Sequence, residues 1–293
     1  MKFDQQVVLV TGSSRGLGNA FAHCLAAAGA QVVINSTGKD DSGQRAADAI
    51  SAQGGRAIHI PGRAEAAHPL VEQIIDKCGR LDAIVHNAGF VEDKTLRKMS
   101  TEQWQRVLDV HLGAAFALSQ AAWPHFEQQH GGRLVFISSA SGLYGNFGQS
   151  NYAAAKAGLY GLARSITLEG AAANIRCNVV APFGATEMNS ANFSPELKAV
   201  IKTEYVAPLV GFLAHPDCPE SGSLFEASAG VYKKVRWQRS AGLAVDINQP
   251  ISLDQIAEGW SQIVDFSQPE YPTEMREALA LMYERRLEPK KDE

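Results

Sequence analysis

The stretch that decides the fold is VVLVTGSSRGLG, residues 7–18. An apolar run, Val7–Val10, leads directly into a loop with glycine at positions 12, 16 and 18. Glycines allow such a loop to turn tightly and to bring its backbone close to a pyrophosphate at the start of a helix. A loop of this kind can also be a plain turn between a strand and a helix. Its place between a buried strand and a predicted helix favours the binding of a dinucleotide.

Outward from this loop, short apolar runs alternate with longer helical patterns. The predicted strands are Val7–Val10, Val32–Asn35, Ala57–Ile60, Ala83–His86, Leu134–Ser138 and Cys177–Ala181. The predicted helices cover residues 17–28, 42–53, 66–78, 102–129 and 151–172. Strands that are apolar throughout are buried on both faces, which is typical of a parallel sheet. The sequence therefore predicts an α/β fold of the Rossmann type, a doubly wound parallel sheet with helices on both faces.

The alternation ends after about residue 182. Prolines punctuate the chain from there to residue 219, which predicts loops and short helices over one end of the sheet. Two amphipathic helices are expected near the end of the chain, at 252–265 and 273–287. No Gly/Ser-rich linker marks a second domain. We therefore predict a catalytic domain, residues 1–240, and a helical C-terminal extension, residues 241–293, that is not an independent domain.

The composition excludes several classes of protein. The chain has 293 residues, 45% of them hydrophobic, and a net charge of -4, which argues against a disordered segment or a nucleic-acid binder. Its four cysteines form no CxxC pair, so we expect neither a disulfide framework nor a metal site. The N-terminus lacks an apolar leader, and no stretch reaches about 18 apolar residues. We therefore expect a cytoplasmic protein that does not bind membranes.

A second motif, NYAAAK at residues 151–156, places Tyr152 and Lys156 on one face of a helix. A nearby ammonium and a positively charged nicotinamide ring would lower the pKa of the phenol from about 10. Tyr152 could then exchange a proton with a carbonyl or hydroxyl oxygen while hydride moves at the neighbouring carbon. Ser139, at the end of a predicted strand, could hydrogen-bond the same oxygen. An isolated Tyr-Lys pair is usually an ordinary helix surface, but the dinucleotide loop in the same chain favours the catalytic interpretation.

Together these motifs resemble those of the short-chain dehydrogenases/reductases. The likeness spans about residues 5–190 and rests on TGSSRGLG at 11–18, HNAG at 86–89, Ser139, YAAAK at 152–156 and PFGAT at 182–186. The resemblance implies that Ser139 orients the substrate, that Tyr152 is the acid and base, and that Lys156 holds the nicotinamide ribose and tunes Tyr152. It also implies a homo-oligomer, either a dimer or a tetramer.

The same resemblance implies a nicotinamide cofactor. Its predicted contacts are Gly12, Ser14, Arg15, Gly16, Leu17, Gly18, Ser36, Thr37, Asn87, Ala88, Gly89, Tyr152, Lys156, Pro182 and Thr186.

The type of cofactor depends on the residues that follow the second predicted strand. An acidic residue there would accept the ribose 2′-hydroxyl of NAD and repel the 2′-phosphate of NADP, but this chain has NSTG at residues 35–38. Arg15 and Lys39 could pair with a 2′-phosphate instead. We therefore favour NADP over NAD. The alternative is that Arg15 is a solvated loop charge and that Asp40 or Asp41 reaches the ribose.

His111 helps to identify the members of the family that the chain resembles most. Many members of the family have asparagine at this position; a histidine within a helix is usually structural, but its imidazole could also lie in a proton path. His111, the stretch 139–149 and a likeness that continues to Arg239 resemble the (3R)-hydroxyacyl-CoA dehydrogenase part of peroxisomal multifunctional enzymes of type 2. This resemblance implies a small-molecule substrate, with an acyl-CoA as the leading candidate. The alternatives are a reductase of another carbonyl (a sugar, steroid or xenobiotic) and a non-catalytic regulator that senses NADP(H).

Overall fold

The computed structural model describes residues 1–184 and 193–287 of the chain. The chain separates into two compact units, Met1–Lys234 and Val235–Glu293. Each unit is described by itself.

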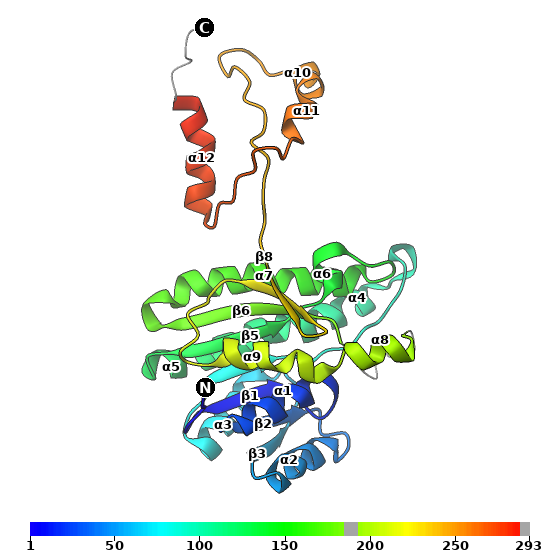
Figure 1. Ribbon diagram of the computed structural model, residues 1–293, viewed down its shortest axis with the longest axis vertical. Helices are drawn as coiled ribbons and strands as arrows, with labels where there is room; N and C mark the ends of the chain where they lie inside the picture. Colours follow the sequence, from blue (N-terminus) through cyan, green and yellow to red (C-terminus); the bar gives the residue numbers. More distant parts are fainter. Residues whose placement is uncertain (185–192, 288–293) are drawn as a thin grey trace. The chain divides into compact units, whose positions relative to one another are not determined.

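The first unit is built on a sheet with the strand order β3-β2-β1-β4-β5-β6-β7-β8 (Figure 1). The strands are β1 (Val7–Thr11), β2 (Gln31–Ser36), β3 (Arg56–Pro61), β4 (Ala83–His86), β5 (Gly132–Ile137), β6 (Ile175–Pro182), β7 (Leu224–Ser228) and β8 (Val231–Val235). Every pairing from β3 to β7 is parallel. The strand order reverses direction between β1 and β4, which defines the doubly wound Rossmann arrangement. The predicted fold class is therefore confirmed.

Helices connect the strands of the first unit. They are α1 (Gly16–Ala27), α2 (Ser42–Ala52), α3 (Ala67–Cys78), η1 (Leu96–Lys98), α4 (Thr101–Leu108), η2 (Asp109–Gly113), α5 (Ala114–Gln128), α6 (Ala140–Tyr144), α7 (Ser150–Gly170), η3 (Ala171–Ala173), α8 (Pro195–Val200), η5 (Thr203–Tyr205) and α9 (Ala207–Ala214).

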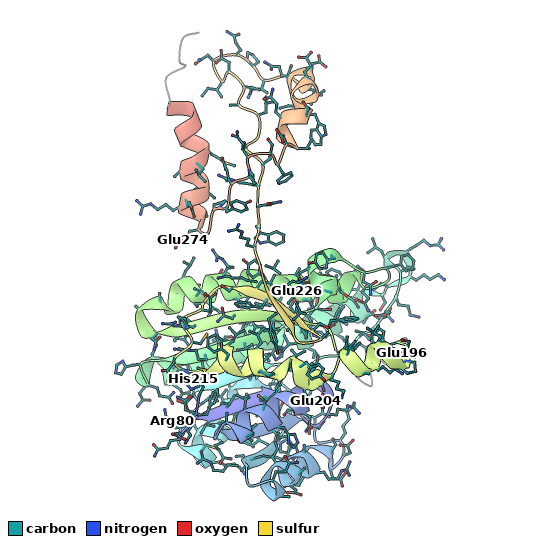
Figure 2. All side chains as sticks on the ribbon, viewed as in Figure 1. Arg80, Glu196, Glu204, His215, Glu226 and Glu274 are labelled. Carbon is teal, nitrogen blue, oxygen red and sulfur yellow. The ribbon has the colours of Figure 1, made fainter. Side chains whose placement is uncertain are left out.

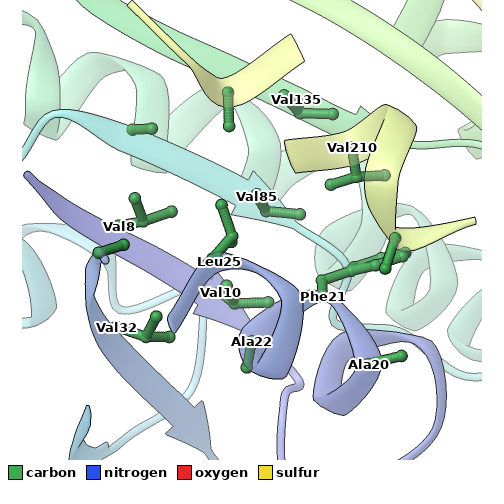
Figure 3. Close-up of a cluster of buried hydrophobic side chains, with 14 of the residues drawn as sticks. Val8, Val10, Ala20, Phe21, Ala22, Leu25, Val32, Val85, Val135 and Val210 are labelled. Atoms are coloured by element: carbon green, nitrogen blue, oxygen red, sulfur yellow. The ribbon is translucent and has the colours of Figure 1, made fainter. Parts of the chain in front are cut away.

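Buried apolar side chains fill both faces of the sheet. On one face, α1, α2 and α9 cover alternate strand residues. The close-up shows side chains of α1 and α9 packed over the strands of this face (Figure 3). Val8 and Val10 of β1 pack there with Phe21 of α1 and Val210 of α9. The intervening residue Leu9 is fully buried as well, and α5 and α7 pack against β5 and β6. Burial on both faces explains why these strands are apolar throughout and could be recognised in the sequence.

The predicted helix at 102–129 is wrong in one respect, because a π-helical segment interrupts it. α4 ends at Leu108, the π-helical segment η2 covers Asp109–Gly113, and α5 begins at Ala114. At this interruption the ring of His86 hydrogen-bonds the carbonyl oxygen of His111 at 3.0 Å. A contact between residues 25 positions apart leaves no trace in the local helical pattern.

The prediction of only loops and short helices after residue 182 is also incomplete. The short helices α8, η5 and α9 are present, but β7 and β8 extend the sheet beyond β6. β7 reads LFEAS and β8 reads VYKKV, and β8 is largely exposed. Such mixed sequences lack the continuous apolar run that marks a buried strand. The two strands are joined at Ala229 and Gly230, whose φ angles of 50° and 74° suit the tight turn of a hairpin.

The second unit contains α10 (Leu253–Glu258), α11 (Trp260–Ile263) and α12 (Met275–Leu287). The single helix predicted at 252–265 is broken at Gly259, where a Cβ would overlap the side chain of Leu243. A pair of backbone hydrogen bonds and an ion pair of 2.7 Å join Arg239 to Glu270. The predicted helix at 273–287 agrees with α12.

Candidate active site

The carboxyl ends of the parallel strands meet at one edge of the sheet, where open α/β sheets bind their ligands. The glycine loop follows β1, Ser36 ends β2, Asn87 follows β4 and Ser139 follows β5. Pro182 ends β6, while Thr186 lies outside the described residues. The structure thus gathers the predicted site residues that it describes at this edge of the sheet.

The glycine loop is packed too closely for side chains. Gly12 has a φ of +62°, and a Cβ there would lie 2.8 Å from Cα of Ala88. A Cβ on Gly18 would lie 2.5 Å from Nδ2 of Asn87 and closer still to the carbonyl oxygen of Gly12. No side chain caps the first turn of α1, which begins at Gly16. Uncapped amides at a helix N-terminus beside a closely packed glycine loop suit the pyrophosphate of a dinucleotide.

Hydrogen bonds with polar side chains hold this loop in place. Asn87 is one of the predicted cofactor contacts, whereas Ser13 could not be recognised from the sequence as a residue that supports the loop. The Asn87 amide donates to the carbonyl oxygens of Thr11 and Gly12, at 3.1 and 3.0 Å. Ser13 accepts a hydrogen bond from the backbone of Asn35 at 3.1 Å and donates one to its carbonyl oxygen through its own backbone amide at 3.0 Å. These bonds fix the loop to the ends of β4 and β2. In the sequence, the only sign of these hydrogen bonds is the presence of polar residues at the ends of apolar strands.

The residues expected to contact the cofactor differ in exposure. Ser14, Leu17, Asn87 and Ala88 are half-buried, whereas Arg15 is exposed. Thr37 is exposed and Ser36 is half-buried at the end of β2. The Ser36 hydroxyl lies 3.0 Å from Nε2 of His59 on β3.

Ser139 and Tyr152 are brought together by α6 and α7. Ser139 is the N-cap residue of α6 and accepts a hydrogen bond from the backbone of Ser141 at 3.2 Å. Burial raises the pKa of the Tyr152 phenol, a hydrogen bond with the side chain of Ser139 lowers it, and the charge of Asp93 raises it. The first of these effects is the largest, so the net pKa of Tyr152 lies above its usual value. None of these three effects is a positive charge. The lowered pKa of Tyr152 expected from the sequence therefore requires an additional positive charge near the phenol.

Lys156 is buried beneath the tyrosine. Its Nζ lies 5.5 Å from the centre of the Tyr152 ring and donates to the carbonyl oxygen of Ile137 at 2.5 Å. Burial lowers the pKa of Lys156 to about 7, because a charged ammonium loses its hydration inside the protein. The Ser138 hydroxyl donates to the backbone carbonyl of Lys156 at 2.8 Å and ties β5 to α7.

His111 packs edge-on against Tyr152, with ring centres 5.1 Å apart. Its Nε2 lies 2.8 Å from the carbonyl oxygen of Phe90, and its Nδ1 is buried with no hydrogen-bond partner among the described residues. A Cβ on Gly89 would lie 2.6 Å from Nδ1 of His111, so the glycine makes room for the imidazole. Burial lowers the pKa of His111, and the charge of Lys156 lowers it further. A neutral imidazole therefore lies beside the tyrosine near pH 7.

His86 links Thr11 to the backbone of His111 through hydrogen bonds. The Thr11 hydroxyl oxygen accepts hydrogen bonds from the backbone amides of Asn87 and Ala88, so its own proton points to Nδ1 of His86 at 3.0 Å. Nε2 of His86 therefore carries the ring proton and donates it to the carbonyl oxygen of His111 at 3.0 Å. Burial lowers the pKa of His86 to about 4, which keeps this donor neutral. His86 belongs to the HNAG motif, but its role as a support could not be predicted from the sequence.

Among residues 1–184 and 193–287, no three His, Cys, Asp or Glu side chains are placed to hold a metal ion. Within the same residues, no helix has the length and apolar character needed to cross a membrane.

The comparison with protein families decides the family. The model of the short chain dehydrogenase family matches residues 6–197. The chain belongs to this family. It is therefore an oxidoreductase of the short-chain dehydrogenase/reductase type, and the family implies an NAD or NADP cofactor, for which the glycine loop is suited.

Relatives of this short-chain dehydrogenase include parts of larger enzymes. It is 41% identical over 287 residues to "Peroxisomal multifunctional enzyme type 2" of Mus musculus, covering 95% of this chain and 39% of the mouse protein. The structure of the full-length multifunctional enzyme type 2 from Drosophila melanogaster matches with a TM-score of 0.86 and 33% identity, over 97% of this chain and 50% of that one. This chain thus spans half or less of these two relatives.

A relative of similar length is also known. The crystal structure of a short chain dehydrogenase from Mycobacterium avium matches with a TM-score of 0.80 and 29% identity, over 90% of this chain and 98% of that one. The fold therefore occurs both within longer enzymes and in a chain of about this size.

Proposed function

We propose that the protein interconverts a (3R)-hydroxyacyl-CoA and the corresponding 3-ketoacyl-CoA, with NADP(H) as the cofactor. The observation that carries the proposal is the placement of Tyr152 on α7, with Nζ of the buried Lys156 5.5 Å from its ring centre and Ser139 at the start of α6, at the edge of the sheet that holds the glycine loop. A proton donor and a hydrogen-bond donor directed at one point suit a substrate oxygen that changes between ketone and alcohol.

In the direction of reduction, Tyr152 donates its phenolic proton to the ketone oxygen and Ser139 hydrogen-bonds the same oxygen. In the direction of oxidation, Tyr152 accepts the proton of the alcohol. The nicotinamide, when bound, supplies or accepts the hydride. The raised pKa of Tyr152 keeps the phenol protonated near neutral pH, which favours its role as the acid in reduction.

Lys156 acts on both the cofactor and the tyrosine in this proposal. A buried amine whose pKa is about 7 changes its charge readily near neutral pH. When it is charged, it stabilises the phenolate of Tyr152 and hydrogen-bonds the nicotinamide ribose. We propose that His111 lies on the path by which Tyr152 regains its proton, because its unpaired Nδ1 is buried close to Tyr152.

The remaining predicted contacts form the proposed cofactor site. Gly12, Gly16 and Gly18 bind the pyrophosphate through the backbone, and Ser14, Leu17, Asn87, Ala88, Gly89 and Pro182 line the nucleotide. Arg15, Ser36 and Thr37 face the adenosine ribose and its 2′-phosphate. The proposed contact of Thr186 with the nicotinamide falls on a residue outside the described ranges.

The proposed acyl-CoA substrate is supported by the resemblance to the dehydrogenase part of multifunctional enzymes of type 2 and by exposed apolar side chains in the segment that precedes α7, the helix of Tyr152. Tyr144 ends α6, and Phe147 lies between α6 and α7 with 89% of its surface exposed. A bridge between Lys94 and Gln149 brings the segment that follows β4 beside this loop. The Tyr144 hydroxyl donates to Glu226 of β7 at 3.1 Å, and Figure 2 labels Glu226 on that strand. Exposed apolar groups around a polar centre suit a substrate with an apolar chain.

A nicotinamide absorbance assay tests the proposed function. Acetoacetyl-CoA and longer 3-ketoacyl-CoAs are each combined with NADPH and with NADH. We expect oxidation of NADPH by the thioesters, and faster than that of NADH. Oxidation only with sugar, steroid or xenobiotic carbonyls would replace the substrate class, and tight NADPH binding without any turnover would favour the sensing regulator.

We further propose that residues 1–240 form the catalytic domain, that 241–293 form its extension, and that the protein is a dimer or a tetramer in the cytoplasm. The boundary between the two compact units at residue 235 supports the domain limits. Phe116 on α5 and Leu168 on α7, exposed by 53% and 63%, support an interface between copies. The relatives are named as peroxisomal, so localisation of the tagged protein in cells decides between the two compartments.

A further inference from the structure

We propose that His59 of β3 determines the cofactor preference, by holding the Ser36 hydroxyl as a hydrogen-bond donor to the 2′-phosphate of NADP(H). The inference rests on the NADP(H) dependence given under the proposed function. It concerns a residue that makes no expected contact with the cofactor itself, so His59 is a positioning residue.

The sheet register places His59 where it can reach Ser36. In the parallel pair of β2 and β3, Ile34 lies opposite His59, and Ser36 follows Ile34 by two positions. Side chains two positions apart on a strand, and those opposite each other in a register, share one face of the sheet. On this face, beneath α2, Nε2 of His59 lies 3.0 Å from the Ser36 hydroxyl oxygen.

Gly43 at the start of α2 packs directly over this contact. A Cβ on Gly43 would lie 2.6 Å from the Ser36 hydroxyl oxygen and would overlap Nε2 of His59. The space above the hydrogen bond therefore exists only because residue 43 is glycine. The three residues come from three different elements and meet at the end of β2.

The hydrogen bond between His59 and Ser36 favours the binding of an anion by the Ser36 hydroxyl. Burial lowers the pKa of His59, so the ring is neutral near pH 7 and has one N–H. When Nε2 carries this proton, it donates to the Ser36 oxygen, and the serine proton is then free to point outward. A hydroxyl held in this way donates to a phosphate oxygen, whereas an acidic side chain at the same position would accept the 2′-hydroxyl of NAD.

The neighbouring charges favour the same cofactor. Asp40 accepts a hydrogen bond from the backbone of Ser42 at 3.0 Å, and Asp41 forms an ion pair with Arg45. Both carboxylates thus have partners within their own segment and are less available to a ribose hydroxyl. The charge of Arg15 acts on Asp40, so this arginine lies within electrostatic range of the segment that follows β2.

The test measures the dissociation constants of NADPH and NADH by cofactor fluorescence in the full-length protein. His59→Ala removes the donor, and Gly43→Ala displaces the imidazole without changing a polar group. We expect each variant to bind NADPH about tenfold more weakly, the effect of one hydrogen bond to a charged group, with NADH binding changed less than about twofold. His59→Gln, which keeps an N–H donor at a similar reach, should restore most of the NADPH affinity.

Matched controls separate this effect from general damage. His68→Ala removes an exposed histidine, and Gly161→Ala adds a methyl group at a helical glycine with nothing within 4 Å. Neither should change the binding of NADPH or NADH. An equal loss of both cofactors in His59→Ala and Gly43→Ala, or no loss of NADPH in either, would overturn the inference while leaving NADP(H) dependence intact. Tighter binding of NADH than NADPH by the wild-type protein would overturn both.

Discussion

The candidate site has a cofactor side and a catalytic side, and the two are built from different groups. The cofactor side depends on backbone and on missing side chains: Gly12 and Gly18 leave room that no other residue could leave. The catalytic side depends on individual side-chain atoms, those of Ser139, Tyr152 and Lys156. Lys156 donates to the carbonyl oxygen of Ile137 on β5 and accepts at its own carbonyl from the Ser138 hydroxyl. The difference implies that substitutions can damage cofactor binding and catalysis separately.

The largest expected effect follows from Tyr152→Phe, which removes one hydroxyl and keeps the ring against His111. Loss of the acid should lower kcat about 1000-fold, within the range for general acid–base catalysis. Cofactor binding should change less than about twofold. Steady-state kinetics and cofactor fluorescence measure the two quantities, with Tyr160→Phe on the same helix as the control. A variant that retains a tenth of the wild-type kcat would exclude Tyr152 as the acid.

On the other side, Gly18→Ala should act on binding. Its methyl group would meet the Asn87 amide and the Gly12 carbonyl, and relief requires movement of the backbone. We expect cofactor affinity to fall about 100-fold, matching an overpacking cost of about 3 kcal/mol, with kcat at saturating cofactor within about threefold of wild type. Gly161→Ala is the control. Unchanged affinity would mean that the loop is only a turn between β1 and α1.

Lys156 should affect stability in a pH-dependent way. Its pKa is about 7 in the folded protein and about 10.4 in an unfolded chain, so between these values the unfolded state binds more protons. The free energy of unfolding should therefore rise with pH across this window, by about 3 to 4 kcal/mol between pH 7 and pH 10 relative to Lys156→Met. Chemical denaturation of both proteins from pH 7 to pH 10 measures the difference. Parallel curves would mean that Lys156 keeps its charge when buried.

The smallest effect is expected for His111→Leu, about a tenfold decrease in kcat, because other routes can return a proton to Tyr152. The pH dependence of kcat should change as well. His111→Asn should recover the hydrogen bond to Phe90 and with it the unfolding temperature, but not kcat. If His111→Leu lowers only the unfolding temperature, the histidine is structural.

The residues themselves explain how much of this could be predicted from the sequence. β1, β2, β4, β5 and β6 are largely buried on both faces, so their apolar runs could be recognised. The glycine loop and YAAAK carry their geometry within a few residues. β7 and β8 escaped prediction because their polar and charged residues resemble a loop. The π-helical segment contains His111, whose carbonyl oxygen accepts a hydrogen bond from His86, and no local sequence pattern contains this contact.

The same reasoning separates the site residues that could be predicted from those that could not. Gly12, Tyr152 and Lys156 belong to compact motifs, whereas Ser36 and His59 meet only because β2 pairs with β3. Partners on different strands depend on the register, which a single sequence does not define. Residues expected to contact ligands could therefore be predicted from the sequence. Residues that hold those contact residues in place could not.

The most direct measurement uses Gly18→Ala, Tyr152→Phe and the double variant, with cofactor affinity and kcat determined for all three. Effects at independent sites add, whereas those at coupled sites do not. The double variant should match Gly18→Ala in cofactor affinity and Tyr152→Phe in kcat at saturating cofactor. A departure of more than about threefold in either quantity would contradict the division of the site into a binding side and a catalytic side.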